Sequence, residues 1–110
     1  MYDEILVPTD GSEAVDRALD HAIRLATDHD ATLHALYVVD QRIAAANSGD
    51  LHDEVVEDLE SQGGAAVEAV AEAATEAGLD AETHVAHGTP DTEIVEYADD
   101  AGIDVIVMSP

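Results

Sequence analysis

The chain has 110 residues, which is room for one domain, and we expect residues 1–110 to form it. Its 26 Asp and Glu residues against three Arg and no Lys give a formal net charge of −23. A surface this negative repels phosphate, which excludes direct nucleic-acid binding and disfavours anionic membranes. No stretch approaches the 18 apolar residues of a membrane-spanning helix, and the absence of cysteine excludes disulfides and thiolate sites.

The first two elements are predicted to be a strand and a helix. Residues 4–8 are a short apolar run followed by the turn residues 9–12, which predicts a buried strand that ends in a loop. Apolar residues then recur at helical spacing, so a helix is expected over residues 12–29 with Ser12 as its N-cap.

A second strand and a long helix follow. The apolar run 31–39 predicts a strand closed by Asp40, and residues 41–50 have the composition of a loop. A helix is expected from Leu51 to about Ala77. The Gly63-Gly64 pair in its middle predicts a kink or close packing against a neighbour. Gly78 is suited to end this helix. The residues expected to face inward are Val56, Leu59, Val67, Val70, Ala74 and Ala77.

The last part of the chain predicts a strand, a helix and a strand. Residues 81–86 alternate weakly, Thr89 and Pro90 have the pattern of an N-cap and first helical residue, and residues 103–108 are apolar apart from Asp104. The stripe of this helix that is expected to be buried consists of Ile94, Val95, Ala98 and Ala101.

Strands that alternate with helices favour an α/β fold with an open, doubly wound, mostly parallel sheet of the Rossmann-like kind. Such sheets bind ligands beyond the carboxyl ends of the strands, where the strand order reverses and the first strand lies beside the fourth. The residues that leave the first strand are Pro8, Thr9 and Asp10, and those that leave the fourth are Met108, Ser109 and Pro110. We therefore expect Asp10 and Ser109 to face one crevice.

Asp10 admits two interpretations. A carboxylate at the end of a strand can accept hydrogen bonds from ribose hydroxyls, while a nearby helix N-terminus attracts phosphate. Alternatively, Asp10 only shapes the turn into Gly11 and Ser12. Spacing alone leaves both open.

Three segments carry a resemblance to a known family. They are the run Ile5–Ser12, the run Tyr37–Asp40, and Gly88-Thr89-Pro90 continued by Ile94, Ala98 and Asp104–Met108. Together they resemble the universal stress protein (UspA-like) family over essentially the whole chain. The resemblance implies the sheet type of the adenine nucleotide alpha hydrolase-like proteins. It also implies that the family's last helix and strand are missing here, so we expect a chain that is truncated at its C-terminus.

The resemblance implies an adenine-nucleotide pocket, occupied by ATP with Mg²⁺ in the intact protein. Asp10 would hold the ribose, the backbone of Val38 would meet the edge of the adenine, and Ser109 would line the sugar side. The residues implied to border the nucleotide are Pro8, Thr9, Asp10, Val38, Met108 and Ser109. In the family a glycine-rich stretch after the fourth strand holds the phosphates. Here Ser109 stands where its first glycine is expected and the rest is absent, so we expect millimolar binding of ATP or none.

The function expected from the resemblance is a cytoplasmic ligand-binding or regulatory module of the stress response, paired as a homodimer, and not a dedicated enzyme. The alternative is a dimeric protein-interaction module of the same family that binds no nucleotide. A receiver domain is disfavoured, because the third strand ends in His87-Gly88 and not in an Asp. A P-loop is excluded by the absence of lysine, and the six histidines show no metal-ligand spacing.

The excess of acidic residues predicts a salt-loving source. The acids lie between well-phased apolar positions and not in blocks, which argues against intrinsic disorder. At molar salt the Debye length is about 3 Å, so the repulsion between surface carboxylates is largely screened. We therefore expect a folded domain that loses stability at low salt.

Overall fold

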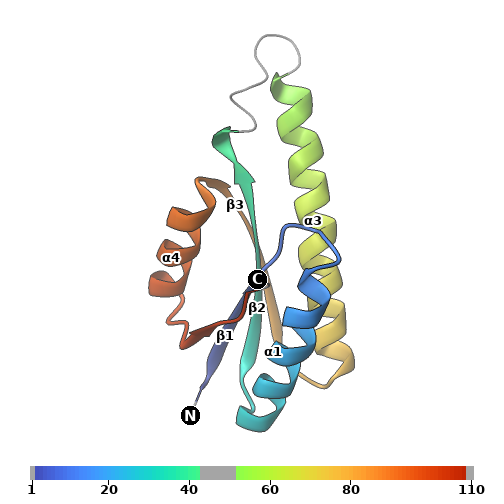
Figure 1. Cartoon of the computed structure of the whole chain (residues 1–110), viewed down its shortest axis with the longest axis vertical. Helices are drawn as coiled ribbons and strands as arrows, with labels where there is room; N and C mark the ends of the chain where they lie inside the picture. Colours follow the sequence, from blue (N-terminus) through green and yellow to red (C-terminus); the bar gives the residue numbers. More distant parts are fainter. Residues whose placement is uncertain (1, 43–51, 109–110) are drawn as a thin grey trace.

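The computed structural model describes residues 2–42 and 52–108, which form a parallel sheet with helices on both faces (Figure 1). Strands and helices alternate as the sequence predicted, and the Rossmann-like α/β class is confirmed. The described elements are β1 (Glu4–Pro8), α1 (Val15–His29), β2 (Thr32–Asp40), α3 (His52–Glu76), β3 (Ala81–Gly88), α4 (Pro90–Asp100) and β4 (Val105–Ile106). Most of the loop predicted over 41–50 lies outside the described residues, and its first two, Gln41 and Arg42, are helical.

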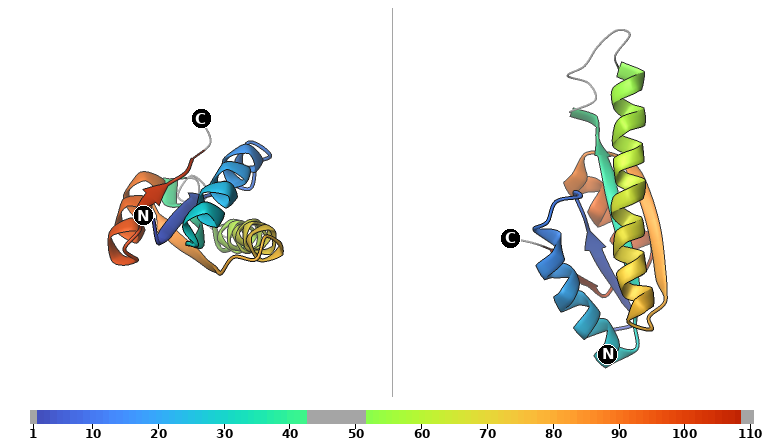
Figure 2. Two further views of the ribbon diagram at one scale, coloured as in Figure 1. Left: turned by 90° about the horizontal axis from the view of Figure 1, so that it is seen from below. Right: turned by 90° about the vertical axis from the view of Figure 1, so that its right-hand side faces the viewer.

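The strand order of the sheet is β3-β2-β1-β4, and all neighbouring strands are parallel. Ile5 of β1 lies opposite Leu33 of β2 on one side and opposite Val105 of β4 on the other. The helices α1 and α3 cover one face of the sheet and α4 covers the other (Figures 1 and 2). The predicted neighbourhood of the first and fourth strands is therefore confirmed, and β1 marks the point where the strand order reverses.

The main core lies between the sheet and the helices α1 and α3. Alternate residues of the strands, such as Ile5 and Val7 of β1, point to this face and are fully buried. Because the chain has no Phe or Trp, alanines let the helices lie close to the sheet; Ala22 and Ala26 of α1 and Ala74 of α3 are fully buried.

Gly63 lies against the ring of Tyr37, where α3 crosses β2. A Cβ at position 63 would approach three ring carbons of Tyr37 more closely than 3.0 Å, whereas a Cβ at Gly64 would meet nothing within 4 Å. Close packing therefore accounts for one glycine of the pair and not for the other.

The ends of two helices differ in how well the sequence predicted them. The N-cap of α1 is Ala14, and no side chain caps this end, so the prediction of Ser12 as N-cap was wrong. The end of α3 follows the prediction for Gly78, which has φ of +84°. The amide of Gly78 donates to the carbonyl of Thr75 and the amide of Leu79 donates to the carbonyl of Ala74, each at 3.0 Å, which is a Schellman motif.

The helix α4 packs less deeply than the sequence predicted. It begins after Thr89 with Pro90 in its first turn, as expected, but none of its residues is buried and Val95 is 64% exposed. Its half-buried face includes Ile94, Tyr97 and Ala98, and the Tyr97 hydroxyl is hydrogen-bonded to His34 in the sheet. Ala77, which was also expected to face inward, follows the last residue of α3 and is exposed.

The strand β4 is two residues long, shorter than the predicted run 103–108. Backbone hydrogen bonds continue its pairing with β1 both before and after these two residues. The amide of Asp104 donates to the carbonyl of Glu4, and the amide of Val107 donates to the carbonyl of Leu6, both at 2.9 Å. The chain after β4 is thereby carried along β1 toward the carboxyl edge of the sheet.

Candidate functional site

The loop between β1 and α1 is shaped by three hydrogen bonds. The amide of Thr9 donates to the carbonyl of Leu36 at 2.8 Å, which prolongs the pairing of β1 with β2. The amide of Gly11 donates to Oγ1 of Thr9 at 3.1 Å, and the amide of Ser12 donates to Oδ1 of Asp10 at 2.9 Å. Gly11 has φ of +82°, a conformation that side-chain-bearing residues rarely adopt. These contacts hold the carboxylate of Asp10 at the carboxyl end of β1.

A pocket of about 350 Å³ lies at this edge of the sheet. Segments far apart in the sequence meet there, because parallel strands end at the same edge and α4 begins beside them. The residues that line it are Pro8, Thr9, Asp10, Val15, Val38, Pro90, Ile94 and Met108.

Five of the six residues predicted for the site lie in this pocket. Asp10, Val38 and Met108 come from three different strand ends and meet there with Pro8 and Thr9. The sixth, Ser109, lies outside the described residues. The expected approach of the two strand ends is therefore observed for Asp10 and for Met108, the residue before Ser109.

Three further lining residues, Val15, Pro90 and Ile94, were not predicted as site residues. The sequence pattern indicated Pro90 only as the start of a helix and Ile94 only as part of its apolar stripe. The signal that could have found them is the position of α4. A helix that follows the carboxyl end of β3 must begin at the same edge as the pocket.

The carboxylate of Asp10 is the only charged group among the residues that line this pocket in the described part of the chain. Hydrogen bonds from the side chain and the amide of Ser12 hold the pKa of Asp10 below its ordinary value of 3.8. The group is therefore ionised at neutral pH and can only accept hydrogen bonds. The turn-shaping role is thus observed, and the exposed carboxylate still forms part of the pocket wall.

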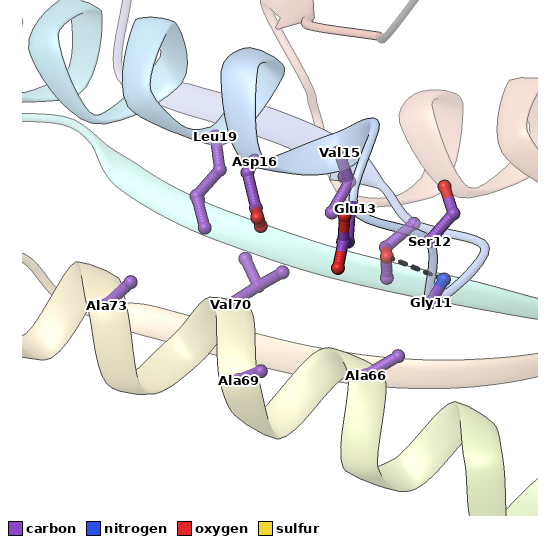
Figure 3. Close-up of a pocket in the computed structure, with 11 residues that line it drawn as sticks. Gly11, Ser12, Glu13, Val15, Asp16, Leu19, Ala66, Ala69, Val70 and Ala73 are labelled. Atoms are coloured by element: carbon purple, nitrogen blue, oxygen red, sulfur yellow. Dashed lines mark hydrogen bonds between the residues drawn. The ribbon is translucent and has the colours of Figure 1, made fainter.

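A second hollow, of about 320 Å³, lies on the other side of the same loop, between α1 and α3 (Figure 3). Thr9 lines both hollows. Side chains of α1 point there toward small side chains of α3. The apolar walls come from Val15, Leu19, Ala66, Ala69, Val70 and Ala73, and the acidic ones from Glu13 and Asp16. Nothing in the sequence pattern predicted this hollow.

Residues 2–42 and 52–108 contain neither a cluster of metal ligands nor a membrane-spanning helix. No three His, Cys, Asp or Glu side chains in these ranges are arranged to hold a metal ion. No helix there is both long enough and apolar enough to cross a membrane.

Comparison with known proteins shows to which family the chain belongs. The model of the universal stress protein family matches residues 1–109. The chain belongs to the universal stress protein family. Universal stress protein MJ0531 of Methanocaldococcus jannaschii is 38% identical over 112 residues, which cover 98% of the chain and 64% of that relative. The chain thus spans less than two thirds of the length of this relative.

Solved structures of universal stress proteins agree in fold. The structure of protein MJ0577, a universal stress protein of Methanocaldococcus jannaschii, is 30% identical with a TM-score of 0.85, over 98% of the chain and 74% of that protein. A universal stress protein solved in complex with cAMP is 28% identical with a TM-score of 0.72, over 96% of the chain and 74% of that protein. The family resemblance carried by residues 5–12, 37–40 and 88–108 is therefore confirmed.

Proposed function

We propose that this universal stress protein domain binds the nucleoside part of an adenine nucleotide in the pocket at the carboxyl ends of β1 and β2. The observation that carries the proposal is the convergence of Asp10, Val38 and Met108 in one pocket. A related protein, 28% identical, is solved in complex with cAMP, which also consists of an adenosine and a phosphate. The volume of about 350 Å³ is at the lower end of the range of about 300–1,000 Å³ for small-molecule pockets.

The lining suits a base and a sugar. Pro8, Ile94 and Met108 offer apolar surface to a flat ring. Val38 lies near the end of β2, where backbone groups can meet the polar edge of adenine. The ionised carboxylate of Asp10 accepts hydrogen bonds from ribose hydroxyls, as expected for a group that stays charged at neutral pH.

The pocket offers the phosphates fewer favourable contacts than it offers the base and the sugar. The N-terminus of α4 borders the pocket at Pro90, and a helix N-terminus attracts anions. The first turn of α4, however, carries Asp91 and Glu93, and no cation is among the residues that line the pocket in the described part of the chain. We therefore expect ATP to bind with a Kd near the millimolar range. In a longer chain that carries the glycine-rich stretch implied by the family resemblance, this stretch and Mg²⁺ would supply the phosphate contacts.

The pocket is suited to hold a ligand and not to transform it. Asp10 is the only titratable group among its described lining residues, and its lowered pKa makes it a poor proton carrier near neutral pH. We propose a regulatory role in the cytoplasm for the domain, as a homodimer that responds to the nucleotide.

A protein-interaction module that binds no nucleotide is the second candidate. The observation that favours it is the exposed apolar surface at the β4 edge of the sheet, where Ile106 is 39% and Met108 57% exposed. Edge strands of this kind pair readily with other chains.

Titration calorimetry separates the two candidates. Adenosine and ATP with Mg²⁺ are titrated in molar KCl into the chain and into a longer chain that adds the family's last helix and strand. The proposal expects adenosine to bind both chains and ATP to gain affinity in the longer one. Asp10→Asn keeps the oxygen that caps the turn but removes the charge, and should weaken adenosine binding by about threefold to tenfold. No heat with either chain, together with dimers in sedimentation, would favour the interaction module.

A further inference from the structure

The helix α4 forms one wall of the pocket and yet is weakly packed. Pro90 and Ile94 line the pocket, but no residue of α4 is buried. Apolar burial, the usual force that fixes a helix on a sheet, is therefore small here. Something else must keep this wall in place.

A polar cluster holds the C-terminal half of α4 against the sheet. His34 of β2 is 3% exposed, and its Nδ1 lies 2.8 Å from the hydroxyl of Tyr97 in α4. Its Nε2 lies 2.9 Å from Oε2 of Glu4 in β1 and 3.5 Å from Oε2 of Glu82 in β3. The ring of Tyr97 also packs on His84 of β3, with centroids 5.3 Å apart. These five residues, Glu4, His34, Glu82, His84 and Tyr97, are called the His34 cluster below.

The hydrogen bond between Tyr97 and His34 can form in either charge state of the imidazole. When the ring is neutral with a proton on Nε2, Nε2–H donates to Glu4 and the Tyr97 hydroxyl donates to Nδ1. When the ring is an imidazolium, both nitrogens donate, and the hydroxyl oxygen of Tyr97 accepts from Nδ1–H. The contact thus links α4 to three parallel strands through one buried side chain.

Tyr97 is well placed to transmit this constraint to the pocket. It lies three residues after Ile94, so both side chains project from the same face of α4. We propose that Tyr97 and His34 are positioning residues for the pocket: their hydrogen bond sets the place of α4, and α4 sets the wall formed by Pro90 and Ile94. This inference rests on the proposed binding of a nucleoside in that pocket.

The test compares Tyr97→Phe, which removes only the hydroxyl, with Tyr2→Phe. Tyr2 is 37% exposed near the N-terminus and does not line the pocket, so it controls for the same chemical change. Amide hydrogen exchange of the ligand-free chains is measured by NMR, and adenosine binding by calorimetry, both in molar KCl.

For Tyr97→Phe we expect exchange in α4 to rise about tenfold, exchange in β1 and β2 to stay unchanged, and the Kd for adenosine to rise about threefold to tenfold. The ¹⁵N shift of His34 Nδ1 should also change. Tyr2→Phe should alter none of these quantities.

The outcomes separate this inference from the proposed function. Unchanged exchange in α4 would overturn the anchoring role, whether or not any ligand binds. Faster exchange with an unchanged Kd would overturn the link between α4 and the pocket. If adenosine does not bind the unaltered chain, the proposed function fails and the positioning role fails with it, while the exchange data still decide what holds α4. Should Tyr97→Phe not fold, His84→Ala removes the ring contact of Tyr97 and leaves the hydrogen bond, and it should raise exchange in α4 to a smaller extent.

Discussion

The carboxylate of Asp104 accepts a hydrogen bond from the backbone N–H of Asp3 at 2.8 Å, across 101 positions of the sequence. The same oxygen accepts the N–H of Glu4 at 3.0 Å. One acidic side chain thereby satisfies two backbone donors at the start of β1 and fixes the approach of β4. Asp104 is the polar residue in an otherwise apolar run, and this contact explains its place there.

The stability that Asp104 provides should depend on pH. Hydrogen bonds from the amides of Asp3 and Glu4 hold the pKa of Asp104 below its ordinary value of 3.8. A carboxyl whose folded-state pKa is lowered stabilises the fold fully above its unfolded-state pKa, and this contribution is lost as the pH falls through the folded-state pKa. Asp104→Asn should therefore lower the Tm at pH 7, and the difference from the unaltered chain should shrink below about pH 4. Asp20→Asn on the exposed face of α1 controls for the loss of one charge. An equal difference at pH 3 and pH 7 would contradict the assignment.

The two glycines of α3 should respond in opposite directions to the same substitution. Gly63→Ala places a methyl group against the ring of Tyr37, and overpacking of this kind costs about 1–3 kcal/mol of unfolding free energy. Gly64→Ala meets no atom within 4 Å and should gain about 0.5–1 kcal/mol from helix propensity. Urea unfolding at constant KCl measures both. Equal effects of the two substitutions would show that the contact with Tyr37 does not decide the stability.

Much of the fold follows from patterns that are local in the sequence. The run Ile5–Pro8 is apolar because β1 lies at the centre of the sheet with a neighbour on each side, and Thr89 before Pro90 marks the start of a helix without any tertiary information. The site followed from the same logic, since the ends of parallel strands must share an edge. This logic predicted Pro8, Thr9, Asp10 and Met108, whereas Val38 was implied only by the resemblance to universal stress proteins.

The misses have two physical causes, a local turn in one case and a contact between distant parts of the chain in the other. Ser12 fits the N-cap pattern, but its amide bonds to Asp10, and α1 starts only at Val15. Val95 fits the apolar stripe of α4, but α4 presents Tyr97 to His34 in the sheet and leaves Val95 64% exposed. A helical wheel contains no information about such a partner.

Salt should stabilise the domain strongly. The formal net charge of −23 on 110 residues makes the surface carboxylates repel one another. At 0.1 M salt the Debye length is about 10 Å and this repulsion remains largely in place, whereas at 1 M salt the Debye length is about 3 Å and the repulsion is screened. We expect the Tm to rise steadily between dilute buffer and molar KCl. Sucrose at equal osmolality controls for effects of excluded solute. A Tm that does not change with KCl would remove the argument for a salt-loving source.

Asp91 offers a test of what limits the binding of phosphate. It lies in the first turn of α4 directly after Pro90, where the helix dipole would favour an anion but the carboxylate opposes one. Asp91→Asn removes the charge at nearly constant volume, and Asp91 is not among the residues that line the pocket. The affinity for ATP should rise by about twofold to fivefold while that for adenosine stays the same, because only ATP carries charge to the helix end. The effect should be largest at the lowest KCl concentration that keeps the chain folded, since the Coulomb interaction is screened by salt.

Asp28→Asn, on the exposed face of α1, is the matched control for net charge. A similar gain for adenosine and ATP would mean that Asp91 acts through the shape of the pocket, and the electrostatic account of weak phosphate binding would then be wrong.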